Sequence, residues 1–319
     1  MSNNKALSVV ICTYDRSELL QKTLFYLLKD APRDGSVEVL VVDNNSSDDT
    51  KAVVARHAQE CPFLRYLFEP LPGLTFARNR GWKESTADFV AYLDDDAIPG
   101  KDWVRNIVSI IKRVHPQPCA IGGPIYLYST PNVPAWMLDS LRFSPWDKEV
   151  FLRSFQKDGA FIGANVVIKR SLLENMNGFS PTYGMTGKKL GLGEEIEFFW
   201  RVSLTLPDIY KNFFYSPSLA VKHFLHPHRA NMRYWLRREF IAGQISMNFD
   251  LDRGQILWHF FLGIAGILFL APLTFLNNYY IRRKFFTALR WVSFSLGYLF
   301  GRNFVRKQLF EREETRTVQ

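Results

Sequence analysis

Cysteine is scarce in this chain of 319 residues. Its three cysteines, Cys12, Cys61 and Cys119, are odd in number, far apart in the sequence and without the spacing of a metal site. A disulfide framework is therefore not expected, and the composition favours a reduced, cytosolic setting. Residues 1–5 lead directly into the first apolar segment, so we expect no signal peptide.

Two common phosphate-binding loops are also missing. The chain contains no G-x-G-x-x-G and no G-x-x-x-x-G-K-S/T sequence. Their absence counts against a dinucleotide-dependent oxidoreductase and against a P-loop enzyme. With 47% apolar residues, the chain nevertheless has enough material for the core of a full domain and for further segments.

Asp, Glu, Lys and Arg are all absent from residues 254–281, a run of 28 residues. A run of this length can cross a bilayer, which requires about 20 apolar residues. A second apolar stretch, residues 285–301, is interrupted by Arg290. The edges of both stretches carry aromatic residues, as membrane interfaces do: Tyr234, Trp235, Trp258, Tyr279 and Tyr280. We therefore expect residues 254–319 to comprise apolar helices that associate with membrane lipid, followed by a polar tail.

The charge of the chain is unevenly distributed. Lys and Arg exceed Asp and Glu by nine, and eight of this excess lies in residues 229–319. Nucleic acid is not an expected partner, because it would require a basic face on the folded core. The basic residues of 229–253 instead predict a helical connector that rests on anionic lipid.

The topology of the apolar segments stays open. A spanning helix or hairpin would place Arg282, Arg283 and Lys284 on the far side, against the positive-inside tendency. An in-plane or re-entrant arrangement avoids this conflict. A helical cap packed on the preceding part of the chain is the alternative that needs no membrane.

Residues 7–96 alternate between short apolar runs and segments with helical periodicity. In order, the predicted strands and helices cover residues 7–12, 17–28, 37–42, 49–60, 64–68, 73–85 and 89–93. This alternation predicts an α/β fold with a mostly parallel sheet. Side chains just beyond the strand ends of such a sheet line one crevice, so Thr13, Asp15, Asp43 and residues 94–96 should converge there.

The strongest single signal is the acidic triplet Asp94, Asp95 and Asp96 at the end of a predicted strand. Three adjacent carboxylates repel one another, and a cation or ligand commonly relieves that repulsion. Mg²⁺ and Mn²⁺ favour carboxylate ligands together with substrate phosphates. The alternative is an acidic turn that caps a helix beginning near Asp102.

Several blocks of sequence follow one another between residues 7 and 225. They are SVVICTYDR (8–16), VVDNNSSD (41–48), Gly73 with ARNRG (77–81), LDDD (93–96), GAN (163–165), Gly178-Phe179 and GEEIE (193–197). In this order they resemble the family 2 glycosyltransferases, which are inverting enzymes of the GT-A fold, here of the bacterial polysaccharide-biosynthesis type. The resemblance implies a mostly parallel central sheet with helices on both faces.

The resemblance also implies roles for residues at the strand ends. Asp43 would hydrogen-bond the nucleotide base, and Thr13 and Asp15 would line the same pocket. Asp94 and Asp95 would face the bound nucleotide, while Asp94 and Asp96 would bind Mn²⁺ or Mg²⁺. Arg78 would add positive charge near the phosphates, or it is a solvated helix residue.

A base is needed to remove the proton from the attacking hydroxyl. The resemblance places it on Glu195, at a position where the family usually has Asp, with Glu194 beside it. A glutamate pair at a helix start is also ordinary capping chemistry. Ile196, Phe199 and Trp200 have helical spacing and are expected to belong to the core.

The resemblance suggests His223 as a third metal ligand, although a His-rich surface turn with His226 and His228 is the alternative. Trp136 and Trp146 lie in and just after a Pro-rich segment, residues 131–145, without regular periodicity. A loop there could stack a sugar ring of the acceptor, or the two rings could be buried anchors.

Together these observations predict a GT-A catalytic domain in residues 1–228, a connector in 229–253 and the apolar segments in 254–319. The predicted activity is inverting transfer from a nucleotide sugar, expected to be UDP-linked, to a saccharide or lipid-linked acceptor. It would take place at the membrane, with the catalytic domain in the cytoplasm. The alternatives are a sugar-nucleotide nucleotidyltransferase and an inactive membrane-bound scaffold that binds sugar or nucleotide.

Overall fold

The computed structural model describes residues 5–186, 191–249, 253–276 and 278–300, so the predicted polar tail lies outside the described residues. The chain divides into two compact units. Residues 1–126 and 143–223 form one, called here the sheet unit, and residues 127–142 and 224–319 form the other, the helical unit. The domain boundaries expected at residues 228 and 253 remain a prediction.

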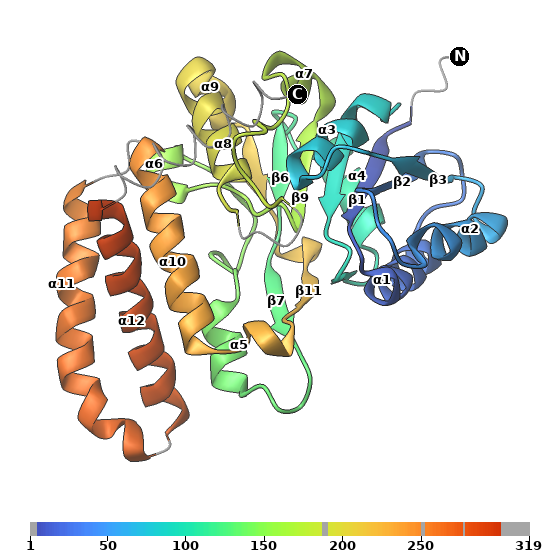
Figure 1. Ribbon diagram of the computed structural model, residues 1–319. Helices are drawn as coiled ribbons and strands as arrows, with labels where there is room; N and C mark the ends of the chain where they lie inside the picture. Colours follow the sequence, from blue (N-terminus) through green and yellow to red (C-terminus); the bar gives the residue numbers. More distant parts are fainter. Residues whose placement is uncertain (1–4, 187–190, 250–252, 277, 301–319) are drawn as a thin grey trace, which may run out of the picture. The chain divides into compact units, whose positions relative to one another are not determined.

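The sheet unit is an α/β structure (Figure 1). Its strands are β1 (Leu7–Thr13), β2 (Val37–Asp43), β3 (Leu64–Phe68), β4 (Phe89–Leu93), β5 (Ala97–Pro99), β6 (Ala120–Gly122), β8 (Val150–Phe151), β9 (Asn165–Lys169) and β10 (Phe213–Tyr215). Its helices are α1 (Ser17–Asp30), α2 (Thr50–Glu60), α3 (Leu74–Glu84), α4 (Trp103–Arg113), α6 (Phe155–Asp158), α7 (Arg170–Asn175), α8 (Glu194–Thr205), α9 (Pro207–Tyr210) and the 3₁₀ turn η1 (Pro217–Leu219). Strands β7 (Ile125–Tyr128) and β11 (Val221–Phe224) cross the boundaries of the unit.

The large sheet has the strand order β3-β2-β1-β4-β9-β6-β10-β8. Strands β1 to β4 are parallel to one another, whereas β9 is antiparallel to both of its neighbours. Every residue of β2 and nearly every residue of β1 is buried, as expected for central strands covered on both faces. The chain moves outward from β1 to β3 and then returns past β1 to β4, so α3 covers the opposite face from α1 and α2 (Figure 1). Ligands bind at the carboxyl ends of the strands where the direction of winding changes.

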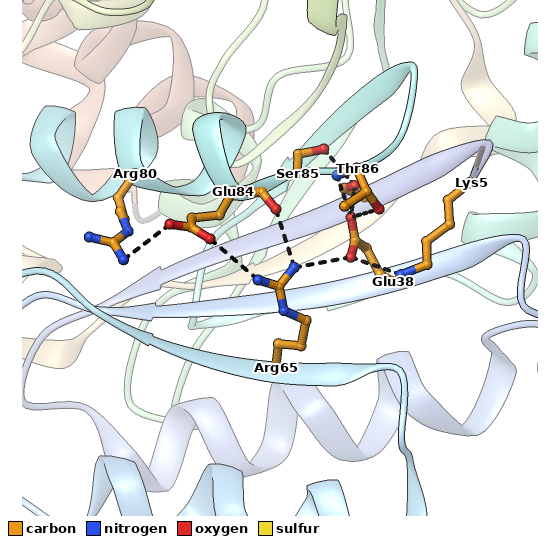
Figure 2. Close-up of polar contacts among 8 residues, drawn as sticks. Lys5, Glu38, Arg65, Arg80, Glu84, Ser85 and Thr86 are labelled. Atoms are coloured by element: carbon orange, nitrogen blue, oxygen red, sulfur yellow. Dashed lines mark hydrogen bonds and ion pairs between the residues drawn. The ribbon is translucent and has the colours of Figure 1, made fainter. Parts of the chain in front are cut away.

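A buried glutamate joins the strands at the opposite edge of this sheet (Figure 2). Glu38 of β2 is fully buried and accepts hydrogen bonds from Ser8, from the backbone and hydroxyl of Thr86, and from Lys5. Arg65 lies 3.4 Å from the same carboxylate. Burial alone would raise the pKa of Glu38, but the hydrogen bonds from Ser8, Thr86 and Lys5 outweigh it and lower the pKa to about 2. Glu38 therefore stabilises the amino-terminal edge of the sheet as an ionised carboxylate.

The helical unit contains α5 (Ala135–Leu141), η2 (Pro227–Arg229), α10 (Met232–Ser246), η3 (Met247–Phe249), α11 (Arg253–Leu270), η4 (Ala271–Leu276) and α12 (Tyr279–Phe300). A small core, made of Val133, Met137, Leu225 and Phe286, joins α5 to α12. The prediction that residues 131–145 lack regular structure is therefore wrong for the centre of this segment, residues 135–141. Helix α5 forms there because its apolar residues pack on α12, which is distant in the sequence.

Candidate active site

The acidic triplet follows β4 directly, at the carboxyl edge of the sheet. Asp95 and Asp96 are buried, while one third of the Asp94 side chain is exposed. The guanidinium of Arg16 lies 3.0 Å from Oδ1 of Asp95 and 3.1 Å from Oδ2 of Asp96. The capping alternative is wrong, because β5 separates the triplet from α4 and Asp102 makes no side-chain capping hydrogen bond.

His223 lies beside this triplet because β11 pairs with β5, the strand that follows it. Its Nε2 atom is 2.7 Å from Oδ1 of Asp96 and 3.4 Å from Oδ2 of Asp94. Burial disfavours the charged imidazole, but the carboxylates of Asp96 and Asp94 outweigh it and raise the pKa of His223 to about 10. Potential ligand atoms of Asp94, Asp96 and His223 all lie within 4.8 Å of one another. Two carboxylates and one imidazole at this spacing fit a divalent cation.

Thr13 and Asp43 end neighbouring strands at the same edge, where they are partners in the register of β1 and β2. Both are buried. The Asp43 carboxylate accepts hydrogen bonds from the hydroxyl of Tyr66, at 2.7 Å, and from the backbone of Ser46, at 2.9 Å. These contacts fix the orientation of Asp43 toward the turn that follows β2.

Asp15 lies in the loop between β1 and α1, with a left-handed backbone conformation (φ 51°). Its Oδ1 atom accepts the backbone N–H of Ser47 at 2.7 Å, and its own N–H donates to Ser46 Oγ. The loops after β1 and β2 are therefore tied together. The roles of Thr13, Asp15 and Asp43 toward a nucleotide remain predictions.

Arg78 is buried in α3, so the solvated alternative for this residue is wrong. Its guanidinium lies 3.2 Å from carboxylate oxygens of both Glu194 and Glu195, and 3.9 Å from Oδ1 of Asp94. Burial would lower the pKa of Arg78, but the three carboxylates outweigh it and keep the group cationic. Arg78 thus connects the triplet to the glutamate pair.

The glutamate pair begins α8, after Gly193 in a left-handed conformation (φ 97°). Glu195 is partly exposed, and its Oε1 atom accepts the backbone N–H of Gly163 at 2.9 Å. Glu194 is buried, and burial together with the charge of Glu195 raises its pKa to about 8. Glu195 is partly exposed and held by Gly163, so it is better placed than the buried Glu194 to meet an acceptor hydroxyl.

The aromatic residues for which the sequence suggested a core or acceptor role pack against other side chains. Phe199 is buried, as expected for the core side of α8, while Ile196 and Trp200 are half-buried. Trp136 packs edge-on against Phe286 inside the helical unit. Trp146 packs against Tyr215 in the sheet unit. Both tryptophans have the contacts expected of packing anchors.

Two residues of the site received no role from the sequence. Arg16 compensates the charge of Asp95 and Asp96, and its only signal was its place at the end of the block SVVICTYDR (8–16). Gly163 approaches the buried ion pairs so closely that an added Cβ would lie 2.1 Å from a nitrogen of Arg78 and 2.4 Å from Oε1 of Glu195. No local pattern reveals this requirement, because Arg78 and Glu195 are distant in the sequence.

The fold is that of the GT-A glycosyltransferases. The mannosyltransferase PcManGT from Pyrobaculum calidifontis, solved in complex with GDP-Man and Mn²⁺, has a TM-score of 0.63 to this chain at 18% identity. The comparison covers 94% of this chain and 88% of the mannosyltransferase. At this identity the likeness concerns the fold alone.

Sequence comparison defines the family. The model described as "Glycosyl transferase family 2" matches residues 8–176, which is more than half of the chain. The chain therefore belongs to glycosyl transferase family 2 and is a glycosyltransferase.

Two relatives align over about three quarters of the chain. The succinoglycan biosynthesis protein ExoM of Rhizobium meliloti is 26% identical over 245 residues, 75% of this chain and 73% of ExoM. A glucosyl-dolichyl phosphate glucuronosyltransferase of Haloferax volcanii is 24% identical over 254 residues, 76% of this chain and 77% of that enzyme.

Proposed function

We propose that this glycosyltransferase transfers a sugar from a UDP-linked donor to a saccharide or lipid-linked acceptor, with inversion, during polysaccharide or glycoconjugate assembly. The observation that carries the proposal is the joining of two acidic groups through Arg78. One group, Asp94 with Asp96 and His223, suits a metal and diphosphate, and the other contains the base candidate Glu195. The names of the relatives support the pathway class, and that of the Haloferax enzyme supports a lipid-linked acceptor.

Asp94, Asp96 and His223 would hold Mn²⁺ or Mg²⁺. The bound cation would supply Lewis-acid neutralisation of the diphosphate leaving group. Thr13, Asp15 and Asp43 would bind the uracil and ribose from the ends of β1 and β2, and Asp95 would support them beside Arg16. Arg78 would add positive charge on the phosphate side of Asp94.

Glu195 would act as the general base. Gly163 and Arg78 hold its Oε1 atom, so the carboxylate is oriented before the acceptor arrives. In the transfer step the acceptor oxygen forms a bond to the anomeric carbon while the bond from that carbon to the phosphate oxygen breaks. The hydroxyl proton passes to Glu195, and attack opposite the leaving group inverts the anomeric centre.

We also propose that the enzyme acts at the membrane, with the sheet unit in the cytoplasm. Within the described residues, Arg253–Leu276 is long and apolar enough to cross a membrane, and most of its side chains are exposed. A surface of this kind in water would expose far more apolar area than single scattered residues do.

A donor-hydrolysis screen tests the function. The purified full chain is incubated with UDP-, GDP-, ADP- and dTDP-sugars, with and without Mn²⁺, and release of the nucleoside diphosphate is measured. We expect release from a UDP-sugar that requires Mn²⁺ and is lost in Glu195→Gln, which also serves to exclude a contaminating hydrolase. Release of a nucleoside monophosphate or pyrophosphate instead would indicate a nucleotidyltransferase. Binding of nucleotide with no turnover for any sugar would indicate a scaffold.

A further inference from the structure

The long apolar helix of the helical unit has an unusual surface. The side chains of Trp258, Phe261, Leu268 and Phe269 in α11, and of Phe275 in η4, are each more than 60% exposed. No charged residue lies between Gly254 and Ile281. Basic residues follow at once, as Arg282, Arg283 and Lys284. An uncharged surface bordered by cations is complementary to a bilayer with anionic headgroups.

The start of α12, which follows α11 and η4 in the sequence, contacts helix α5 of the helical unit. The hydroxyl of Tyr279, at the start of α12, donates a hydrogen bond to the carboxylate of Asp139 in α5. Asp139 lies four residues before Phe143, where the chain re-enters the sheet unit. Four residues span at most about 14 Å. The hydrocarbon core is about 30 Å thick, so Tyr279 cannot lie across it from Phe143.

The near end of the helix is constrained by α10, which precedes it. Arg233, Arg237, Arg238 and Glu239 occupy the first half of α10, and such charges are expensive inside a bilayer. The uncharged remainder, Phe240–Phe249, is helical through η3. At about 1.5–2 Å per residue it measures about 16 Å, half of the hydrocarbon thickness. This segment alone therefore does not reach the far side of the hydrocarbon core.

The third helix cannot separate from α10 to cross alone. Arg290, in the middle of α12, lies 2.6 Å from Oε1 of Glu239 and donates to the carbonyl of Ser140 at 2.7 Å. The backbones of α10 and α12 also touch. A Cβ added at Gly243 would lie 2.0 Å from the carbonyl oxygen of Phe294, and one at Gly297 would lie 1.9 Å from that of Phe240. Separation would expose a charged pair to lipid and lose this close packing.

We infer that the helical unit is monotopic: α11 and η4 insert into a single leaflet, and both of their ends stay on the side of the sheet unit. The inference rests on the proposed membrane association and specifies how α11 and η4 lie in the bilayer. The apolar side chains of α11 face acyl chains, whereas α10 and α12 keep the Glu239–Arg290 pair inside the unit. Arg282, Arg283 and Lys284 then remain on the cytoplasmic side with the anionic headgroups.

Accessibility of introduced cysteines tests the topology. The full chain is expressed with Asn248→Cys or Lys284→Cys, at exposed positions on either side of α11, in a Gram-negative host. Intact spheroplasts and permeabilised membranes are treated with a membrane-impermeant maleimide. The parent chain gives the background from Cys12, Cys61 and Cys119, and Asn248→Ser and Lys284→Ser are matched controls. A co-expressed protein with an outward-facing cysteine confirms that the reagent reaches the outer surface.

We expect both variants to sediment with membranes, to stay unlabelled in intact spheroplasts and to gain labelling after permeabilisation. Labelling of Lys284→Cys in intact spheroplasts would show a single crossing by α11 and overturn the inference. Labelling of Asn248→Cys would show that the α10–α11 connection crosses, with the same consequence. The unsubstituted chain gives an independent result, because protease added to intact spheroplasts should leave it whole, and cleavage would overturn the inference.

Fractionation separates this outcome from failure of the proposed membrane association. A chain found in the soluble fraction at low salt would refute membrane association itself, and the topology would fall with it. Release by about 1 M salt would show electrostatic binding alone, because the Debye length is then only about 3 Å. Release would therefore overturn leaflet insertion, which salt does not screen. Retention in salt with solubilisation by detergent is the expected result.

Discussion

Arg78 and Glu195 approach within 3.2 Å, and through this contact the metal side of the site meets the base candidate. Arg78 is buried between three carboxylates, and Glu195 is the one with a backbone hydrogen bond from Gly163. Removing the charge of Arg78 would leave Glu194, Glu195 and Asp94 to repel one another at low solvent exposure. The position of Glu195 therefore depends on Arg78, the same residue that faces Asp94 of the triplet.

The first prediction concerns Glu195→Gln. The amide preserves shape and can still contact Gly163, but it cannot accept the proton of the attacking hydroxyl. We expect UDP binding within the error of the parent and a loss of turnover of about 10²–10⁴-fold, as is usual for a missing general base. Steady-state kinetics with calorimetric UDP titration measures both quantities. Glu60→Gln, on the exposed side of α2, is the matched control and should behave as the parent.

Near-normal turnover of Glu195→Gln would remove the base assignment. Glu194 and Glu197 would then be the next candidates. Glu197 already pairs with Arg201 at 2.7 Å, and Glu194 is buried against Arg78 at 3.2 Å.

The second prediction concerns Gly163→Ala. The added Cβ would overlap the guanidinium of Arg78 and the carboxylate of Glu195, so one of them must move. Overpacking of this kind costs about 1–3 kcal/mol of folding stability. Turnover should also fall, because the contact between Arg78 and Glu195 is disturbed. Mn²⁺-dependent UDP binding should persist. Gly163 does not lie in the left-handed region, so the effect of Gly163→Ala reflects this overlap and not backbone strain. Unchanged turnover in Gly163→Ala would show that the Arg78–Glu195 contact is not needed for transfer.

The sequence predicted those parts of the structure that depend on neighbouring residues. The strand over residues 64–68 matches β3 in both bounds, and α1, α2 and α3 each agree to within two residues, because their apolar spacing is local. The convergence of Thr13 with Asp43 followed from the parallel order of the strands alone. The family resemblance predicted Asp94, Asp96 and His223 as metal ligands, and their potential ligand atoms lie close together in the structure.

Features that depend on distant partners were not predictable in this way. Helix α5 is stabilised by Phe286, which lies about 150 residues later, so a Pro-rich stretch without clear periodicity hid it. The burial of Arg78 depends on carboxylates more than 100 residues away, and its own helix gave no sign of it. Gly163 is required by both partners at once.

The third prediction is a pH dependence of stability from Glu38. The folded-state pKa of about 2 lies below the usual value near 4.5, so this carboxylate stabilises the fold above about pH 4.5 and loses that effect as the pH falls toward 2. The difference corresponds to about 3 kcal/mol. Glu38→Gln should therefore lower the free energy of unfolding by about that amount at pH 7, and the gap to the parent should narrow as the pH falls.

Urea unfolding at several pH values, monitored by circular dichroism, measures this gap. Glu84→Gln alters a half-exposed carboxylate of the same network and should cost less than about 1 kcal/mol. A gap between Glu38→Gln and the parent that stays constant with pH would show that Glu38 stabilises the sheet by packing and not by its charge.

The most direct test of the account is a calorimetric titration of UDP into the full chain and into Asp96→Asn, each with Mn²⁺ and with EDTA. The central claim is that Asp96, with Asp94 and His223, binds the cation that in turn binds the diphosphate. Changes in the outer shell of a metal site already cost 10–100-fold in affinity, so loss of a direct ligand should reduce Mn²⁺-dependent UDP affinity by more than about 100-fold. Asp102→Asn, outside the cluster, should leave it unchanged. An Asp96→Asn variant that is folded and keeps the Mn²⁺ enhancement of the parent would contradict the claim.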